Sequence, residues 1–202
     1  MSTLLIHNEP GAVVLHLGPM MKKISDEDFF EFCQLNREWR IERTKEGDLI
    51  IMPPTGSKTG ERNFKLTVKF GNWAEIDGTG KGFDSSTGFT LPNGAERSPD
   101  LSWIKLERWN ALTDDEQKRF APICPDFVVE LRSESDGLEV LQEKMKEYIE
   151  NGAKLGWLID LFEKYVYIYR QQAAVECLAN PDTVIGDPLL QGFVLNVKDI
   201  WD

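Results

Sequence analysis

Histidine and cysteine are scarce in this chain of 202 residues. Its two histidines, His7 and His16, both lie in the N-terminal stretch, which argues against a histidine-based catalytic triad or a histidine-rich metal site. The three cysteines, Cys33, Cys124 and Cys177, are far apart and form no CxxC pair. We therefore expect neither a complete disulfide framework nor a cysteine-based zinc site, but reduced and mostly buried thiols.

Long apolar runs are also lacking. No uninterrupted run approaches the roughly 20 residues of a transmembrane helix. The N-terminal segment MSTLLIHNEPGAVVLHLG has no basic region ahead of its apolar part, and Glu9 and Pro10 interrupt it, so it does not fit a signal peptide. We expect a cytoplasmic protein with no membrane partner.

Positive charge is in deficit: 23 Lys and Arg stand against 34 Asp and Glu, a formal net charge of −11. This balance argues against a protein that coats nucleic acid through its overall charge. It remains compatible with an enzyme that has a local basic face and an acidic metal site. The length and the 41% hydrophobic content fit one domain with a substantial core.

Predicted helices and strands interleave along the chain, which indicates an α/β or α+β class built around one mixed sheet. The helices are expected after Ser25, at about 57–76, at 113–120 and at 138–151, the last one ended by Gly152. The strands are expected in a hairpin at 39–52 that turns near Gly47, at 81–92, 100–106 and 125–132, in a hairpin at 154–170, and near 173–178 and 193–197.

Three acidic residues, Glu42, Asp100 and Glu130, stand on predicted strands where an apolar residue would be ordinary. In the strand at 125–132, the two-residue period puts the odd-numbered residues on a fully apolar face and Glu130 on the other face. That second face becomes more polar toward its C-terminal end, where sites on such sheets usually lie. For each carboxylate alone, a solvated edge position or a simple ion pair is the alternative interpretation.

The predicted helix at 138–151 carries a lysine that could serve the site. Lys144 falls between Val140 and Tyr148, roughly 40° from each, at the margin of an apolar stripe, so its stem should lie along packed surface. A lysine at such a margin often only extends its ammonium to water. Here the margin is also placed to face the end of the strand that carries Glu130.

A basic stripe is predicted on the helix at 57–76. Its members are spaced to lie within roughly 60° of one another, a pattern suited to a phosphate backbone, although a solvated helix face is equally compatible. They are Lys58, Arg62, Lys65 and Lys69.

Three ordered segments carry a family resemblance: SPDLSW at 98–103, PDFVVELRSESD at 125–136 and LQEKMKEYIENGAKLGWLID at 141–160. With them, the chain resembles the family of predicted restriction endonucleases that is greatly expanded in cyanobacteria, a branch of the PD-(D/E)XK nuclease superfamily. The resemblance covers nearly the whole chain. It implies a single restriction-endonuclease-like domain at 23–202, with a mixed sheet flanked by helices, and an N-terminal extension at 1–22.

The resemblance also implies a site for Mg²⁺ or Mn²⁺. Asp100 matches the aspartate of the PD motif and Glu130 the acidic residue of the (D/E)XK motif. The usual lysine position holds Arg132, and in this branch the lysine has moved to the next helix, at Lys144. Glu42 resembles the additional N-terminal acidic residue of many such nucleases.

On this basis we expect an endonuclease that hydrolyses DNA phosphodiester bonds. Asp100, Glu130 and the carbonyl oxygen of Leu131 are the expected metal ligands, because Mg²⁺ prefers oxygen donors. Glu42 is expected to hold a second metal or a metal-bound water, and Lys144 to orient the attacking water. The basic stripe would contact DNA, and a homodimer would suit cleavage of both strands.

Two other functions fit the residues. The first is an inactive nuclease-fold binding module, which the net charge and Arg132 favour. The second is a hydrolase that uses paired carboxylates on another substrate, as glycosidases do.

Overall fold

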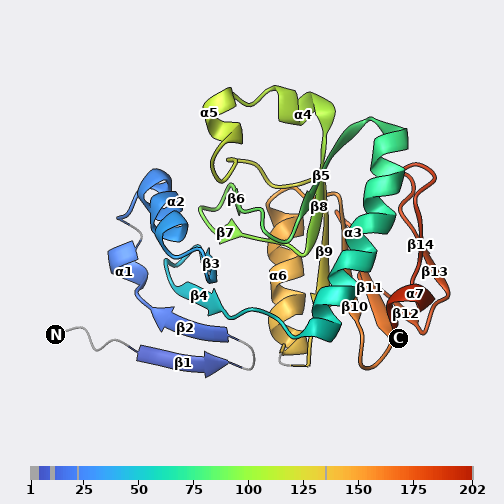
Figure 1. The fold of residues 1–202 in the computed structure, drawn as a ribbon, viewed down its shortest axis with the longest axis horizontal. Helices are drawn as coiled ribbons and strands as arrows, with labels where there is room; N and C mark the ends of the chain where they lie inside the picture. The colour runs from blue at the N-terminus through green and yellow to red at the C-terminus, as the bar shows by residue number, and fades with distance from the viewer. Residues whose placement is uncertain (1–4, 10–11, 22, 135, 202) are drawn as a thin grey trace.

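The computed structural model describes residues 5–9, 12–21, 23–134 and 136–201. Its strands form two six-stranded sheets and one two-stranded sheet (Figure 1). In the first sheet all paired neighbours are antiparallel. Its strand order is β1 (Leu5–Glu9), β2 (Ala12–His16), β4 (Leu49–Met52), β3 (Arg40–Arg43), β7 (Glu96–Arg97) and β6 (Phe89–Thr90).

The second sheet is mixed, because β9 and β10 are parallel while its other neighbours are antiparallel. Its order is β12 (Glu176–Ala179), β11 (Tyr165–Arg170), β10 (Leu155–Asp160), β9 (Phe127–Arg132), β8 (Leu101–Lys105) and β5 (Gly80–Asp84). Parallel neighbours need a crossover, and helix α6 (Leu138–Glu150) supplies it between β9 and β10. The third sheet pairs β13 (Thr183–Ile185) with β14 (Val194–Asn196).

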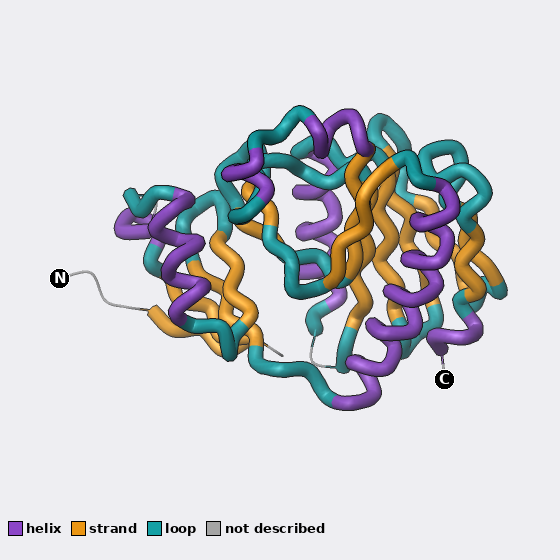
Figure 2. Tube along the Cα trace, turned by 45° about the horizontal axis from the view of Figure 1, so that its top comes forward, coloured by secondary structure: helices purple, strands orange, loops and turns teal. Residues whose placement is uncertain are grey.

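Two long helices cover opposite faces of the second sheet (Figure 2). Helix α3 (Ser57–Asp77) packs on the face that carries Phe127 and Val129, and α6 packs on the face that carries Val128. The alternation predicted for β9 is therefore confirmed. The shorter helices are α1 (Gly18–Met21), α2 (Asp26–Leu35), α4 (Leu106–Asn110), α5 (Asp114–Gln117) and α7 (Lys198–Trp201).

Several element boundaries follow from local chemistry. Helix α2 begins after Ser25, whose hydroxyl accepts the Asp28 N–H at 3.1 Å. Gly152, with φ of 114°, follows the end of α6, and Gly47, with φ of 92°, turns the hairpin between β3 and β4. These positions need the left-handed backbone that glycine tolerates. The sequence predicted all three.

Other expectations need correction. The strands do not share one sheet, since the hairpin of β3 and β4 joins the antiparallel sheet instead of the mixed one. Thiol burial is also less complete than expected: Cys124 is buried, but Cys33 is half-buried and Cys177 is exposed, all three without a disulfide. Among the described helices, none combines the length and apolarity that crossing a bilayer requires.

The predicted N-terminal extension is only partly described, since residues 1–4, 10–11 and 22 lie outside the described ranges. Within it, β2 pairs with β4 in the first sheet, from Val13 opposite Ile51 to Leu15 opposite Leu49. The extension thus adds strands beside the hairpin that carries Glu42.

Candidate active site

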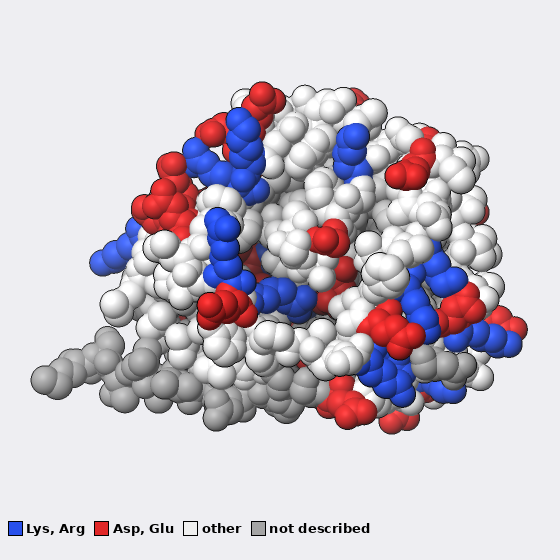
Figure 3. All heavy atoms as spheres, viewed as in Figure 1, with Lys and Arg blue, Asp and Glu red and all other residues white. Residues whose placement is uncertain are grey.

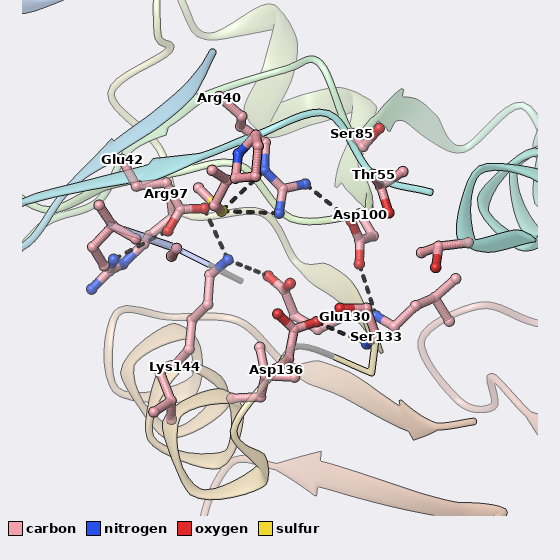
Figure 4. Close-up of a pocket in the computed structure, with 18 of the residues that line it drawn as sticks. Arg40, Glu42, Thr55, Ser85, Arg97, Asp100, Glu130, Ser133, Asp136 and Lys144 are labelled. Atoms are coloured by element: carbon pink, nitrogen blue, oxygen red, sulfur yellow. Dashed lines mark hydrogen bonds and ion pairs between the residues drawn. The ribbon is translucent and has the colours of Figure 1, made fainter. Parts of the chain in front are cut away.

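A cavity of about 1220 Å³ is lined by residues of β2, β3, β4, α3, β9 and α6. It opens near the middle of the face shown in Figure 3. The four predicted catalytic residues all line it: Glu42 from β3, Asp100 directly before β8, Glu130 from β9 and Lys144 from α6. Figure 4 shows their side chains pointing toward one another.

Asp100 is brought beside Glu130 by strand pairing. Strands β8 and β9 are antiparallel with Leu101 opposite Val129, so the same register puts Asp100, directly before β8, opposite Glu130. The Asp100 side chain is buried, and its Oδ2 accepts the N–H of Leu131 at 2.8 Å. Its Oδ1 accepts a hydrogen bond from Arg40 Nη1 at 3.1 Å.

Glu130 is almost fully buried, with an exposed fraction of 2%. Its Oε1 lies 2.8 Å from Lys144 Nζ and accepts the Tyr148 hydroxyl at 3.1 Å. Burial raises the pKa of this carboxyl to about 7, and the nearby charges of Asp100 and Glu42 add to the rise against the opposing effect of Lys144. Glu130 therefore holds a proton more readily than an ordinary glutamate does.

Lys144 bridges two carboxylates. Its Nζ lies 2.9 Å from Glu42 Oε1 and 2.8 Å from Glu130 Oε1, and it is 5.9 Å from the centre of the Tyr148 ring. Burial alone would lower its pKa, but the two carboxylates outweigh burial and raise it. The ammonium is therefore a fixed positive charge at the site.

Glu42 uses both of its oxygens. Oε1 also accepts the N–H of Ser98 at 3.0 Å, and Oε2 accepts Arg97 Nη1 at 3.2 Å. Although burial opposes ionisation, the charges of Lys144, Arg97 and Arg40 lower the pKa of Glu42 to about 2. Glu42 thus holds Lys144 through one oxygen and Arg97 through the other.

Arg132, which the sequence resemblance places at the usual lysine position, pairs with residues other than Glu130. Its Nη1 lies 2.7 Å from Asp160 Oδ2, across the register of β9 and β10, and its Nε donates to the carbonyl of Asp136. Its guanidinium also lies over the Phe162 ring. The cation that contacts Glu130 is Lys144 instead.

The sequence interpretation missed three members of the site: Arg40, Arg97 and the hydroxyl of Tyr148. Arg40 precedes Glu42 by two residues, so strand alternation places both on one face, a signal that was present in the sequence. Arg97 directly precedes the SPD segment. Tyr148 was predicted on the apolar stripe and in a K-x-x-x-Y pattern with Lys144, but nothing local shows that its hydroxyl reaches Glu130.

The predicted basic stripe does not form one open row. Arg62 is buried and its Nη2 donates to the carbonyl of Trp201 at 2.9 Å, so its expected role as an exposed phosphate contact is corrected to a tertiary contact. Lys65 pairs with Glu61 at 3.0 Å, Lys69 pairs with Asp199, and Lys58 is exposed at the cavity rim. On the face in Figure 3, basic and acidic side chains lie side by side.

The donor set fits a hard divalent cation. Asp100 and Glu130 present carboxylate oxygens to one cavity, and oxygen donors are what Mg²⁺ and Mn²⁺ prefer. Among the residues with described positions, no group of three or more His, Cys, Asp or Glu side chains has the geometry of a metal site. The carboxylates of Asp100 and Glu130 are thus the candidate side-chain ligands of a divalent cation.

The chain belongs to the Uma2 family, described as "Putative restriction endonuclease", whose sequence profile matches residues 26–198. Its fold is similar to a crystal structure from Anabaena variabilis ATCC 29413, described as "a putative nuclease belonging to DUF820". The TM-score is 0.68 at 21% identity, over 88% of this chain and 97% of that chain. The family resemblance and the fold class are confirmed. No curated protein matches the chain.

Proposed function

We propose that the protein is an endonuclease that uses Mg²⁺ or Mn²⁺ to hydrolyse DNA phosphodiester bonds. One observation carries the proposal: two buried carboxylates, Asp100 and Glu130, face one cavity with the Lys144 ammonium 2.8 Å from Glu130. Membership of the family supports it. We also propose that this site is of the PD-(D/E)XK type, with its lysine on α6 instead of on the strand.

Each residue has a distinct task in this proposal. Asp100 and Glu130, with the carbonyl oxygen of Leu131, hold the cation. When bound, the cation stabilises charge on the phosphate oxygens and lowers the pKa of a water ligand. The N–H of Leu131 keeps Asp100 oriented. Lys144 orients the attacking water, and Glu42 keeps Lys144 in place.

Four further parts of the proposal concern the DNA path, the assembly, the location and the domain bounds. DNA enters past Lys58 at the rim, with Lys65 and Lys69 further along α3. A homodimer would cut both strands of a duplex by two-fold symmetry. The location is cytoplasmic, in keeping with three thiols that form no disulfide. The domain spans 23–202, with 1–22 as its extension.

A second function, a nuclease-fold module that binds without cleaving, is favoured by the ion pairing of the site. Arg97 and Lys144 already bind carboxylates, and the net charge is −11. Such a module would bind DNA or a protein with no metal-dependent turnover.

The test is cleavage of supercoiled plasmid with Mg²⁺, with Mn²⁺ or with EDTA. Asp100→Asn and Glu130→Gln should abolish cleavage while the circular dichroism spectrum is unchanged. Lys144→Ala should slow cleavage by about 10²-fold or more, because it removes the fixed positive charge that orients the attacking water.

Lys146→Ala is the matched control, since Lys146 is half exposed on the same helix and pairs with Glu143. Full cleavage by Asp100→Asn would overturn the site assignment. A wild-type protein that binds DNA but leaves the plasmid intact with both metals would favour the binding module.

A further inference from the structure

Arg40 has weaker partners than the other arginines of this region. Its Nη1 donates to Asp100 Oδ1 at 3.1 Å, while its Nε and Nη2 face the Met52 sulfur at 3.4 and 3.2 Å. A thioether is a poor hydrogen-bond acceptor, so much of the donor capacity of the guanidinium is unused. A third of the side chain, 33%, is exposed, and it lines the cavity (Figure 4).

The neighbouring arginines are held by strong acceptors. Arg97 contacts both Glu42 and Glu147 and is 9% exposed, and Arg132 contacts Asp160 at 2.7 Å. Arg43 forms two 2.5 Å hydrogen bonds with Glu96. Compared with these three, Arg40 gives up the least when it changes partner.

Arg40 also occupies an oxygen that a cation would need. Each Asp100 oxygen accepts one hydrogen bond, Oδ2 from the backbone N–H of Leu131 and Oδ1 from Arg40. Of these two donors only the Arg40 side chain can turn away, so Oδ1 is the oxygen that its departure would free for a divalent cation. A divalent cation between Asp100 and Glu130 would repel the nearby guanidinium. A phosphate oxygen would in turn attract it, because a guanidinium binds phosphate through a planar fork of donors.

We propose that Arg40 changes partner during the nuclease cycle. It neutralises Asp100 while no divalent cation is bound, and it turns to a non-bridging oxygen of the DNA phosphate when the cation is bound. Cation and phosphate then bind cooperatively, since each favours the same position of Arg40. This inference rests on the proposed function and adds a phosphate-binding residue to it.

The test separates charge from geometry with two variants. Arg40→Ala removes the competing charge, so it should bind Mn²⁺ without DNA about fivefold or more tightly than wild type, measured by electron paramagnetic resonance. Arg40→Lys keeps the charge and should bind Mn²⁺ as wild type does. Both variants lose the fork, so both should raise the KM for an oligodeoxynucleotide by about tenfold or more.

Arg37→Ala is the matched control, because Arg37 lines the same cavity but its Nε donates to the carbonyl of Gln34. It should change neither measurement. Weaker or unchanged Mn²⁺ binding by Arg40→Ala would show that Arg40 only supports Asp100, and would overturn the inference. If Glu130→Gln also bound Mn²⁺ as tightly as the wild type does, the proposed metal site itself would fail. If Glu130→Gln abolished binding, the failure would concern Arg40 alone.

Discussion

Glu130 is the residue whose protonation should control metal binding. Its pKa is raised to about 7 by burial and by the neighbouring carboxylates, so in the metal-free protein it is protonated below that pH. A proton and a cation compete for the same carboxyl. We expect the affinity for Mn²⁺ to rise with pH and to level off above about 7, measured by titration between pH 5.5 and 8.5.

Glu130→Gln supplies the comparison for this pH dependence, because an amide cannot titrate. Its residual Mn²⁺ binding should not follow the same curve. A wild-type affinity that stays constant between pH 6 and 8 would contradict the expectation, and would mean that Glu130 is ionised throughout that range.

At the scale of elements, α6 packs on the sheet at Gly156 of β10 through the end of the Met145 side chain. A Cβ added there would overlap the Met145 methyl carbon and lie 3.4 Å from Val128 Cγ2. The missing side chain leaves room for the buried Met145 side chain, which is adjacent to Lys144 on α6. Gly156→Val should therefore lower the free energy of unfolding by about 1–3 kcal/mol.

Urea unfolding checks this prediction, with Gly71→Ala as its control. Gly71 lies inside α3 with no atom within 4 Å of an added Cβ, so alanine should stabilise the helix by about 0.5–1 kcal/mol. Equal stability of Gly156→Val and wild type would show that α6 does not need this glycine.

The sequence predicted elements whose signals are local and missed features that depend on distant contacts. Three confirmed predictions depend on a few neighbouring residues each: the cap at Ser25, the turn at Gly47 and the alternation of β9. The burial of Arg62 depends on Trp201, 139 positions away, and no helical period shows it. Likewise, Arg40 meets Asp100 only because the two large sheets lie side by side at the cavity.

At the scale of the whole molecule, folding gathers like charges at a cost. The cavity brings together Glu42, Asp100 and Glu130, opposed by Lys144 and two arginines. The cost falls on Glu130, because its pKa is higher in the folded protein, at about 7, than its ordinary 4.5. Protonated Glu130 therefore favours the folded state. Its contribution to the free energy of unfolding is fully present below about pH 4.5 and is lost as the pH rises through about 7. A functional carboxylate therefore makes the metal-free fold less stable above neutral pH.

Metal binding should recover that stability. A ligand that binds only the folded state at ~100 times its Kd adds about 2.7 kcal/mol, which corresponds to about 5–10 °C in Tm for a domain of this size. We expect Mg²⁺ to raise the Tm of the wild type at pH 8 by such an amount.

Glu130→Gln should melt at a higher temperature than the metal-free wild type, because it removes the buried charge, and Mg²⁺ should not raise its Tm further. Glu139→Gln, an exposed position on α6, should behave as wild type does. If Mg²⁺ stabilised Glu130→Gln as much as the wild type, the cation would bind elsewhere in the molecule.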